Sequence, residues 1–141
     1  MAVTVVSHPV RATRRRIQRE WGAVVEGVDD CADLVAEPWD TSRTTSPDRV
    51  VVPLRAALEA AGLLEQLSTL LTDAVDAAGC ELGASPVPAP PYVTVTSRGP
   101  ILRATIDPGR LVIRFDAFEV VRDPGPAYRR LDGVRLDVSL E

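Results

Sequence analysis

The chain has 141 residues, of which 45% are hydrophobic, and a formal net charge of −4, as expected for a globular protein of one domain. The mild negative charge argues against a general attraction to nucleic acid, and no apolar run reaches the roughly 18 residues that would indicate a membrane span. All sixteen basic residues are Arg, and Lys and Asn are absent, which indicates coding by a GC-rich genome.

The first predicted helix spans residues 8–37. It begins at Ser7-His8-Pro9, where a capping side chain precedes a proline in the first turn. Apolar residues recur along it at spacings of three and four, which is the pattern of one buried helical stripe. Gly22 and Gly27 inside the helix predict a bend or a close contact, and Pro38 predicts its end.

Two further helices are predicted. Ser46-Pro47-Asp48 is a typical helix start, and residues 50–61 continue that helix, with a kink expected at Pro53. The next helix covers residues 63–78 and buries a stripe of Leu, Ala and Val. Gly79 follows where a C-terminal cap belongs.

Residues 80–91 contain four prolines and predict an extended link between a helical part, residues 1–79, and a sheet part, residues 92–141. Beyond the link the periodicity changes from helical to two-residue, and turn residues separate the runs. The expected fold class is α+β, a single domain over residues 1–141 in which three N-terminal helices pack on one face of a four-stranded antiparallel meander. The predicted strands are residues 92–97, 101–106, 111–122 and 134–140.

A register for the first three strands follows if Arg98-Gly99 and Pro108-Gly109 are two-residue loops. Every residue on one face is then apolar, and a slip of one residue would destroy this separation. Arg103 stands directly opposite Arg114 on the other face. The predicted inner face consists of Val93, Val95, Leu102, Ala104, Ile106, Leu111, Ile113 and Phe115.

The third strand contains a change of phase. Continued alternation would put Glu119 inside and Phe118 outside. A bulge near Asp116-Ala117 would return Phe118 and Val120 to the core. The alternative is that this end of the sheet is covered on both faces.

No catalytic or metal-binding pattern is present in the sequence. His8 is the only histidine, Cys31 and Cys80 are far apart, and none has metal-ligand neighbours at the usual spacing. Phosphate-binding glycine loops and nucleophile elbows are missing. The acids between Asp29 and Asp33 fit a solvated helix face better than a Mg²⁺ site. We therefore expect no enzymatic activity, cofactor or metal, and no disulfide.

The densest charge cluster lies in the first helix, where five arginines fall between Arg11 and Arg19. Clustered Arg can bind phosphates, and Arg11, Arg14 and Arg15 are therefore candidate binding residues. The following segment is acidic and no aromatic residue is interleaved, so pairing within the helix or docking of a partner is the preferred interpretation.

The polar face of the sheet is the second candidate binding surface. It carries Arg103 and Arg114, flanked by Thr94, Thr96 and Thr105, and Tyr92 lies on the same face. One interpretation is that Asp116 or Asp137 neutralises the two arginines. The other is that the arginines and hydroxyls receive an acidic surface or a phosphate from a partner.

The two tryptophans have different predicted roles. Trp21 lies on the apolar stripe of the first helix and is expected in the core. Trp39 follows Pro38 in a polar link. It is either an exposed anchor or a cap on the helical layer.

The segment PPYVTVTSRGPILRATIDPGRLVIRFDAFEVVR, residues 90–122, resembles an uncharacterised family of haloarchaeal proteins, and RVVVPLRAALEAAG strengthens the resemblance. It implies a halophilic lineage and a single domain, although the acidity is modest for such a lineage. It supplies no functional residues.

The leading functional hypothesis is a non-enzymatic protein-interaction module that binds a partner or itself. A nucleic-acid-associated accessory protein and a small-ligand-binding domain are the alternatives. Met1–Val6 is apolar but short, and it lacks the basic region and the full-length apolar region of a secretory signal, so we expect a cytoplasmic protein that makes no use of a membrane.

Overall fold

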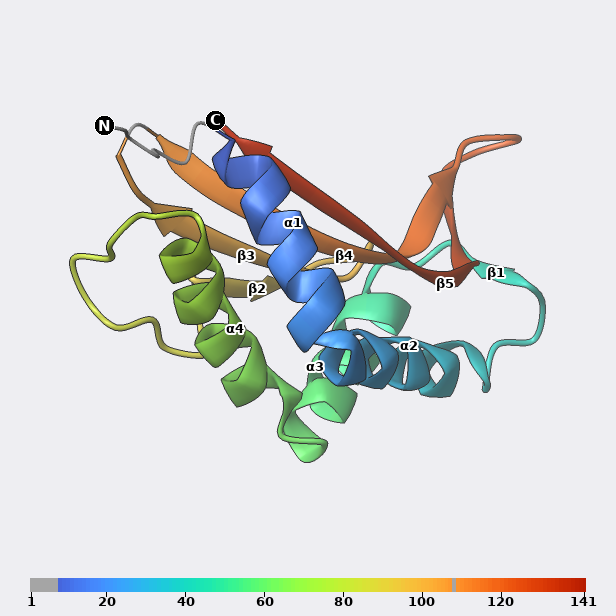
Figure 1. Ribbon diagram of the computed structural model, residues 1–141. Coiled ribbons are helices and arrows are strands. Elements are labelled where there is room, and N and C mark those ends of the chain that lie inside the picture. The colour runs from blue at the N-terminus through green and yellow to red at the C-terminus, as the bar shows by residue number, and fades with distance from the viewer. Residues whose placement is uncertain (1–7, 108) are drawn as a thin grey trace, which may run out of the picture.

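The structure, a computed structural model, describes residues 8–107 and 109–141, and within these it forms four helices and five strands (Figure 1). The predicted cap at Ser7 and the segment Met1–Val6 lie outside the described residues. In chain order the elements are α1 (Pro9–Glu20), α2 (Gly22–Ala36), β1 (Arg43–Thr44), α3 (Asp48–Ala60), α4 (Leu63–Ala77), β2 (Val93–Val95), β3 (Pro100–Thr105), β4 (Arg110–Val121) and β5 (Ala127–Leu140).

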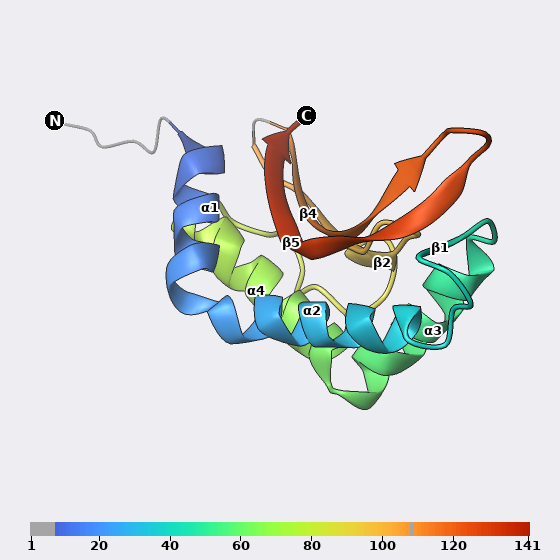
Figure 2. The same cartoon turned by 90° about the vertical axis from the view of Figure 1, so that its right-hand side faces the viewer.

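The helices and the sheet form two layers. The strands pair antiparallel in the order β1-β5-β4-β3-β2, and the helices cover one face of the sheet (Figure 2). The other face carries no helix in the described part of the chain. The sheet is bent, so that the end of the β4–β5 hairpin rises away from the helices. The α+β class is confirmed, with one more helix and one more strand than expected.

The additional helix arises because the first predicted helix breaks at Trp21. The backbone of Trp21 leaves helical geometry, with φ −119° and ψ 23°. Its N–H closes α1 on the carbonyl of Ile17, while its own carbonyl accepts from Val24 and Val25 at the start of α2. The predicted close contact is found at Gly27, where a Cβ would lie 3.0 Å from Leu63.

The other two helices begin and end close to the predicted residues. α3 starts at Asp48 and continues through Pro53. At the end of α4, Gly79 adopts φ 76°, and its N–H and that of Cys80 donate to the carbonyls of Asp76 and Val75. This is the glycine-dependent cap that the sequence indicates.

The predicted inner face of the sheet is confirmed, because its eight residues are at most 7% exposed. The predicted register is wrong by two residues. Leu102 pairs with Val93 and Ile113, which keeps the faces but separates Arg103 from direct opposition to Arg114. The error lies in the position of the loop before β3. Gly99 follows this loop with φ 145°, and a Cβ there would overlap the carbonyl oxygen of Phe115. The two backbone segments can therefore approach each other only with a glycine at this position.

The bulge in β4–β5 is confirmed. The register shifts between Asp116 and Phe118, whose partners are Arg135 and Arg130, so the additional residues lie on β5. Phe118 returns to the core and is fully buried, whereas Val120, predicted to follow it, remains half-buried. β5 begins at Ala127 rather than at residue 134. Charged residues interrupt the apolar pattern in this added part, but they have partners in the fold: Arg129 pairs with Glu119 and Arg130 with Asp29.

Candidate anion-binding pocket at the edge of the sheet

A pocket of about 480 Å³ lies where the proline-rich link meets β3 and β4. Tyr92 pairs with Arg103 through a backbone hydrogen bond of 3.0 Å, and before Tyr92 the chain leaves the edge of β3. The link folds over the edge that is left free. The pocket is lined by Leu82, Gly83, Ala84, Pro91, Tyr92, Arg103, Ala104, Thr105 and Arg110.

The strand pairing brings two arginines to this pocket. Alternation along β3 puts Arg103 and Thr105 on the face that bears no helix, and Arg110 of β4 lies directly opposite Thr105. Arg103 and Arg110 are therefore diagonal neighbours. Diagonal positions are about 7–8 Å apart, within reach of two long side chains. Leu82 and Pro91 supply an apolar wall beside the guanidinium groups.

The two pocket arginines have no ion-pair partner among the described residues, whereas Arg114 does. Arg114 donates to Oδ2 of the buried Asp116 at 3.3 Å and lies opposite Asp137 in the register. For Arg114, the interpretation in which Asp116 or Asp137 neutralises the arginine therefore holds. Arg103 has no carboxylate opposite it on β4, whereas Arg110 lies opposite Glu141, to which two backbone hydrogen bonds of 2.8 Å join it, without a side-chain ion pair.

Thr94 and Thr96, two of the predicted binding residues, do not line this pocket. Thr96 closes the turn before β3: its hydroxyl donates to the carbonyl of Gly99 at 2.8 Å and accepts from the N–H groups of Arg98 and Gly99. Thr94 is half-buried opposite Ile101. Of the residues predicted to form the binding surface on the sheet, Arg103 and Thr105 line the pocket, whereas Arg114, Thr94 and Thr96 do not.

Sequence reasoning missed Arg110 as a lining residue, whereas it placed Thr105 and Tyr92 on the polar face of the sheet. Arg110 follows Gly109 and was assigned to a turn. The correct strand register would have identified Arg110. When each predicted hairpin loop is moved one residue toward the N-terminus, Arg110 lies opposite Thr105.

The arginine cluster of the first helix divides between structural and free residues. Arg11, Arg14, Arg15 and Arg19 are exposed. The half-buried Arg16 binds Asp73 of α4 through two hydrogen bonds of 2.8 and 3.1 Å.

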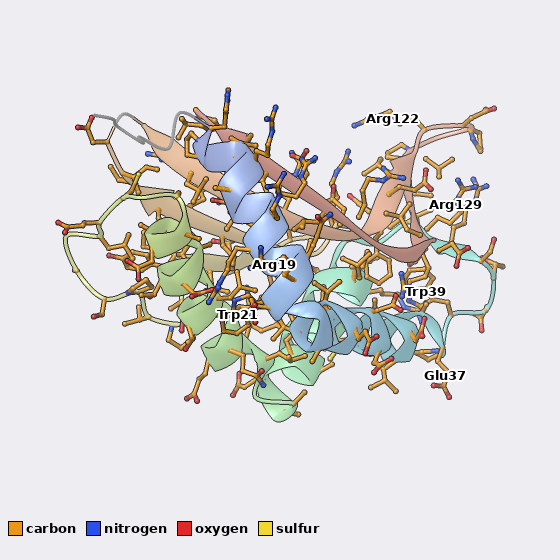
Figure 3. All side chains as sticks on the ribbon, in the orientation of Figure 1. Arg19, Trp21, Glu37, Trp39, Arg122 and Arg129 are labelled. Atoms are coloured by element: carbon orange, nitrogen blue, oxygen red, sulfur yellow. The ribbon has the colours of Figure 1, made fainter. Side chains whose placement is uncertain are left out.

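Asp73 also accepts from the indole Nε1 of Trp21 at 2.8 Å. The bonds from Arg16, with a smaller contribution from Trp21, lower the pKa of Asp73, although partial burial opposes the shift. Trp21 is therefore half-buried as the hydrogen-bonded link between the α1–α2 corner and α4, a position visible in Figure 3.

A second pocket, of about 400 Å³, lies at the start of α1. It is lined by His8, Pro9, Val10, Arg11, Arg14 and Leu140. The arginine cluster and the sheet pocket thus share no lining residue.

The most densely bonded arginine is Arg130, which fills the β4–β5 bulge. Its side chain is 15% exposed. It donates to the carbonyls of Ala117, Leu131 and Gly133 and, on α2, to the carbonyl and carboxylate of Asp29. Asp33 lies 3.3 Å away. This network holds the bent end of the sheet on α2 and leaves little capacity for a ligand.

Trp39 is packed inside the molecule, so the exposed-anchor interpretation is wrong. The residue is 9% exposed, and its ring lies 5.8 Å from that of Phe118. Figure 3 places it beneath the part of the hairpin that carries Arg129. Trp39 therefore caps the helical layer, as the alternative interpretation states.

Within residues 8–107 and 109–141, no group of three His, Cys, Asp or Glu side chains is arranged to hold a metal ion. Both cysteines are free. Burial, with a smaller effect of Asp30, raises the pKa of the Cys31 thiol, which opposes formation of a nucleophilic thiolate. None of the described helices combines the length and apolar character needed to cross a bilayer.

Comparison with known proteins gives a family. No curated protein and no solved structure matches the chain. Residues 11–141, which include every element from α1 to β5, match a family model described as a domain of unknown function. The chain therefore belongs to the DUF7988 family.

Proposed function

We propose that the protein is a non-enzymatic interaction module, and that its sheet pocket binds an acidic segment of a partner protein. The observation that carries the proposal is the convergence of Arg103 and Arg110, neither ion-paired within the described chain, on a pocket with an apolar wall. Among the described residues, Arg16, Arg114, Arg129 and Arg130 have carboxylate partners, whereas Arg103 and Arg110 have none and line one pocket together.

The chemistry of the pocket fits a carboxylate beside an apolar group. A guanidinium donates two parallel hydrogen bonds to a carboxylate. Leu82, Pro91 and the ring of Tyr92 could cover an aliphatic side chain next to it. A short acidic peptide with an interspersed Leu has both features.

A small organic anion is the second candidate, favoured by the pocket volume. About 480 Å³ lies within the range of small-molecule sites, roughly 300–1,000 Å³. The same arginines would bind its acidic group. Cytoplasmic location is part of the proposal, supported by the two free cysteines.

The proposal is tested with the double variant Arg103→Gln/Arg110→Gln. Its matched control is Arg49→Gln/Arg55→Gln, which removes the same charge from exposed positions on α3. The probe is a hexapeptide of Asp, Glu and Leu, with its Asn/Gln/Leu counterpart as the neutral reference. Binding is followed by amide chemical shifts in nuclear magnetic resonance.

The acidic peptide should shift the amides of Arg103, Thr105 and Arg110. The double variant should bind at least about tenfold more weakly, a loss of about 1.4 kcal/mol, and the control should bind like the wild type. Equal shifts with the neutral peptide, or unchanged binding by the double variant, would refute the proposal. Tight binding of free succinate at the same amides, with none of the peptide, would select the small-anion candidate.

A further inference from the structure

A basic ridge lies on α1, remote from the sheet pocket. It consists of Arg11, Arg14, Arg15 and Arg19, all exposed and spaced three or four residues apart. Within the described part of the chain, none of the four forms an ion pair; the only α1 arginine that does is Arg16. Like charges four residues apart destabilise a helix. The basic ridge therefore lowers the stability of α1, and no ion pair of these four residues within the described chain offsets that loss.

An acidic ridge lies on the exposed face of α2. It consists of Glu26, Asp30 and Glu37, together with Leu34, which is 61% exposed. Leu34 lies four residues after Asp30 and three before Glu37, so these side chains share one side of the helix. The neighbouring Asp29 and Asp33 bind Arg130 instead.

The two ridges do not neutralise each other within one chain. α1 and α2 meet only at the Trp21 corner and then run in different directions (Figure 2). In Figure 3, Arg19 on α1 and Glu37 at the far end of α2 are well separated. The described residues form no ion pair between the two helices.

We infer that a second copy of this chain covers these ridges. α1 of each protomer docks on α2 of its partner about a two-fold axis, so that the basic ridge of one meets the acidic ridge of the other twice. Reciprocal contact of this kind closes at two subunits. Leu34 supplies an apolar anchor that packs on the aliphatic stems of the opposing arginines.

The chemistry of both ridges favours the chain's own copy over a nucleic acid. A phosphate backbone would be attracted to α1, but the net charge of −4 of the whole chain opposes its approach. An exposed Leu contributes nothing to phosphate binding. Exposed ion pairs are individually weak and screened by salt, so the dimer depends on the network and weakens as ionic strength rises.

Charge exchange tests the inference by sedimentation at low ionic strength. The first variant, Arg14→Glu/Arg15→Glu, reverses the two central charges of the basic ridge, and the second, Glu26→Arg/Asp30→Arg, reverses two of the three charges of the acidic ridge. Each alone should raise the dimer dissociation constant at least about tenfold, because like charges then face each other. An equimolar mixture should form a heterodimer, since both of its contacts join opposite charges. A chain that carries all four substitutions should dimerise with itself.

Three controls make the outcome decisive. Arg49→Glu/Arg55→Glu reverses two charges on α3 and should leave the dimer intact, as should the sheet-pocket variant Arg103→Gln/Arg110→Gln. Circular dichroism melts identify any variant that fails to fold, and Leu34→Ser, which changes no charge, should weaken the dimer independently. A monomeric wild type at every accessible concentration, or no rescue on mixing, would overturn the inference. A wild type that remains monomeric but sediments with duplex RNA would assign the basic ridge to nucleic acid.

Discussion

The bulge and the sheet pocket both use arginine, yet the two regions use it in opposite ways. Arg130 is nearly enclosed and donates to carbonyls and carboxylates of three chain segments. Arg103 and Arg110 line an open pocket and have no ion-pair partner in the part of the chain that the structure describes. An enclosed charge must be compensated by the fold, whereas a solvated one is available to a ligand. The number of acceptors around an arginine therefore distinguishes a structural residue from a candidate binding residue.

The largest expected effect is at Arg130. Replacement by Ala leaves the carbonyls of the bulge without their donor, at a cost of about 1–3 kcal/mol for each group that stays buried, while the carboxylate of Asp29, 37% exposed, becomes solvated. We expect a loss of that size in the free energy of unfolding, measured by urea denaturation. Arg129→Ala is the control, because Arg129 pairs with Glu119 at the surface and should cost less than about 1 kcal/mol. Equal losses in the free energy of unfolding for the Arg130 and Arg129 variants would contradict the distinction between an enclosed and a surface arginine.

An intermediate effect is expected at Asp73, whose partners are half-exposed. Asp73→Asn should cost about 1–2 kcal/mol at neutral pH, below the range for charged hydrogen bonds because Arg16 is partly solvated. The folded state lowers the pKa of Asp73 below its ordinary 3.8, chiefly through Arg16. Its contribution is therefore complete well above pH 3.8 and is lost as the pH falls through the lowered value. The unfolding free energy of the variant should decline less in this acidic range; parallel pH profiles would contradict the assignment.

The smallest effect is expected at the sheet pocket itself. Arg103→Gln/Arg110→Gln should change the free energy of unfolding by no more than about 0.5 kcal/mol, as for surface substitutions without specific partners. Arg114→Gln on the same face sharpens the comparison, because it leaves the buried carboxylate of Asp116 without its donor and should cost about 1–3 kcal/mol. Thermal melts of the three proteins measure both effects. A stability loss in the pocket variant equal to that of Arg114→Gln would show that the pocket arginines are structural.

How much of the fold could be predicted depends on which contacts are local. The inner face of the sheet and the bulge followed from alternation, since Phe118 could reach the core only through a change of phase. The break at Trp21 was predicted only as a possible bend at the adjacent Gly22. That the helix ends there did not follow from the sequence, because the apolar stripe continues through it and the indole of Trp21 binds Asp73, 52 residues away. The start of β5 was missed for the same reason: the partners of Arg130 are distant in sequence.

The candidate site was predicted only in part. Alternation placed Arg103 on the correct face, but the choice of Arg114 as its neighbour required the register, which the glycine positions left ambiguous by two residues. Residues of the link that line the pocket carry no pattern of their own. Their role is set by where α4 ends and β2 begins.

The bulge in β5 has a consequence for how sequences of this family can vary. Between Arg130 and Arg135 the strand contains residues that face no partner on β4, and the guanidinium of Arg130 binds the carbonyls that this excess chain turns inward. The length of residues 131–134 and the side chain at position 130 are thus interdependent. A homologue in which this stretch is shortened to regular strand pairing has no inward carbonyls for an arginine to bind. A homologue that replaces the arginine has carbonyls that need another donor. A deletion within residues 131–134 and the loss of the arginine should therefore occur together, and each should be tolerated less well alone.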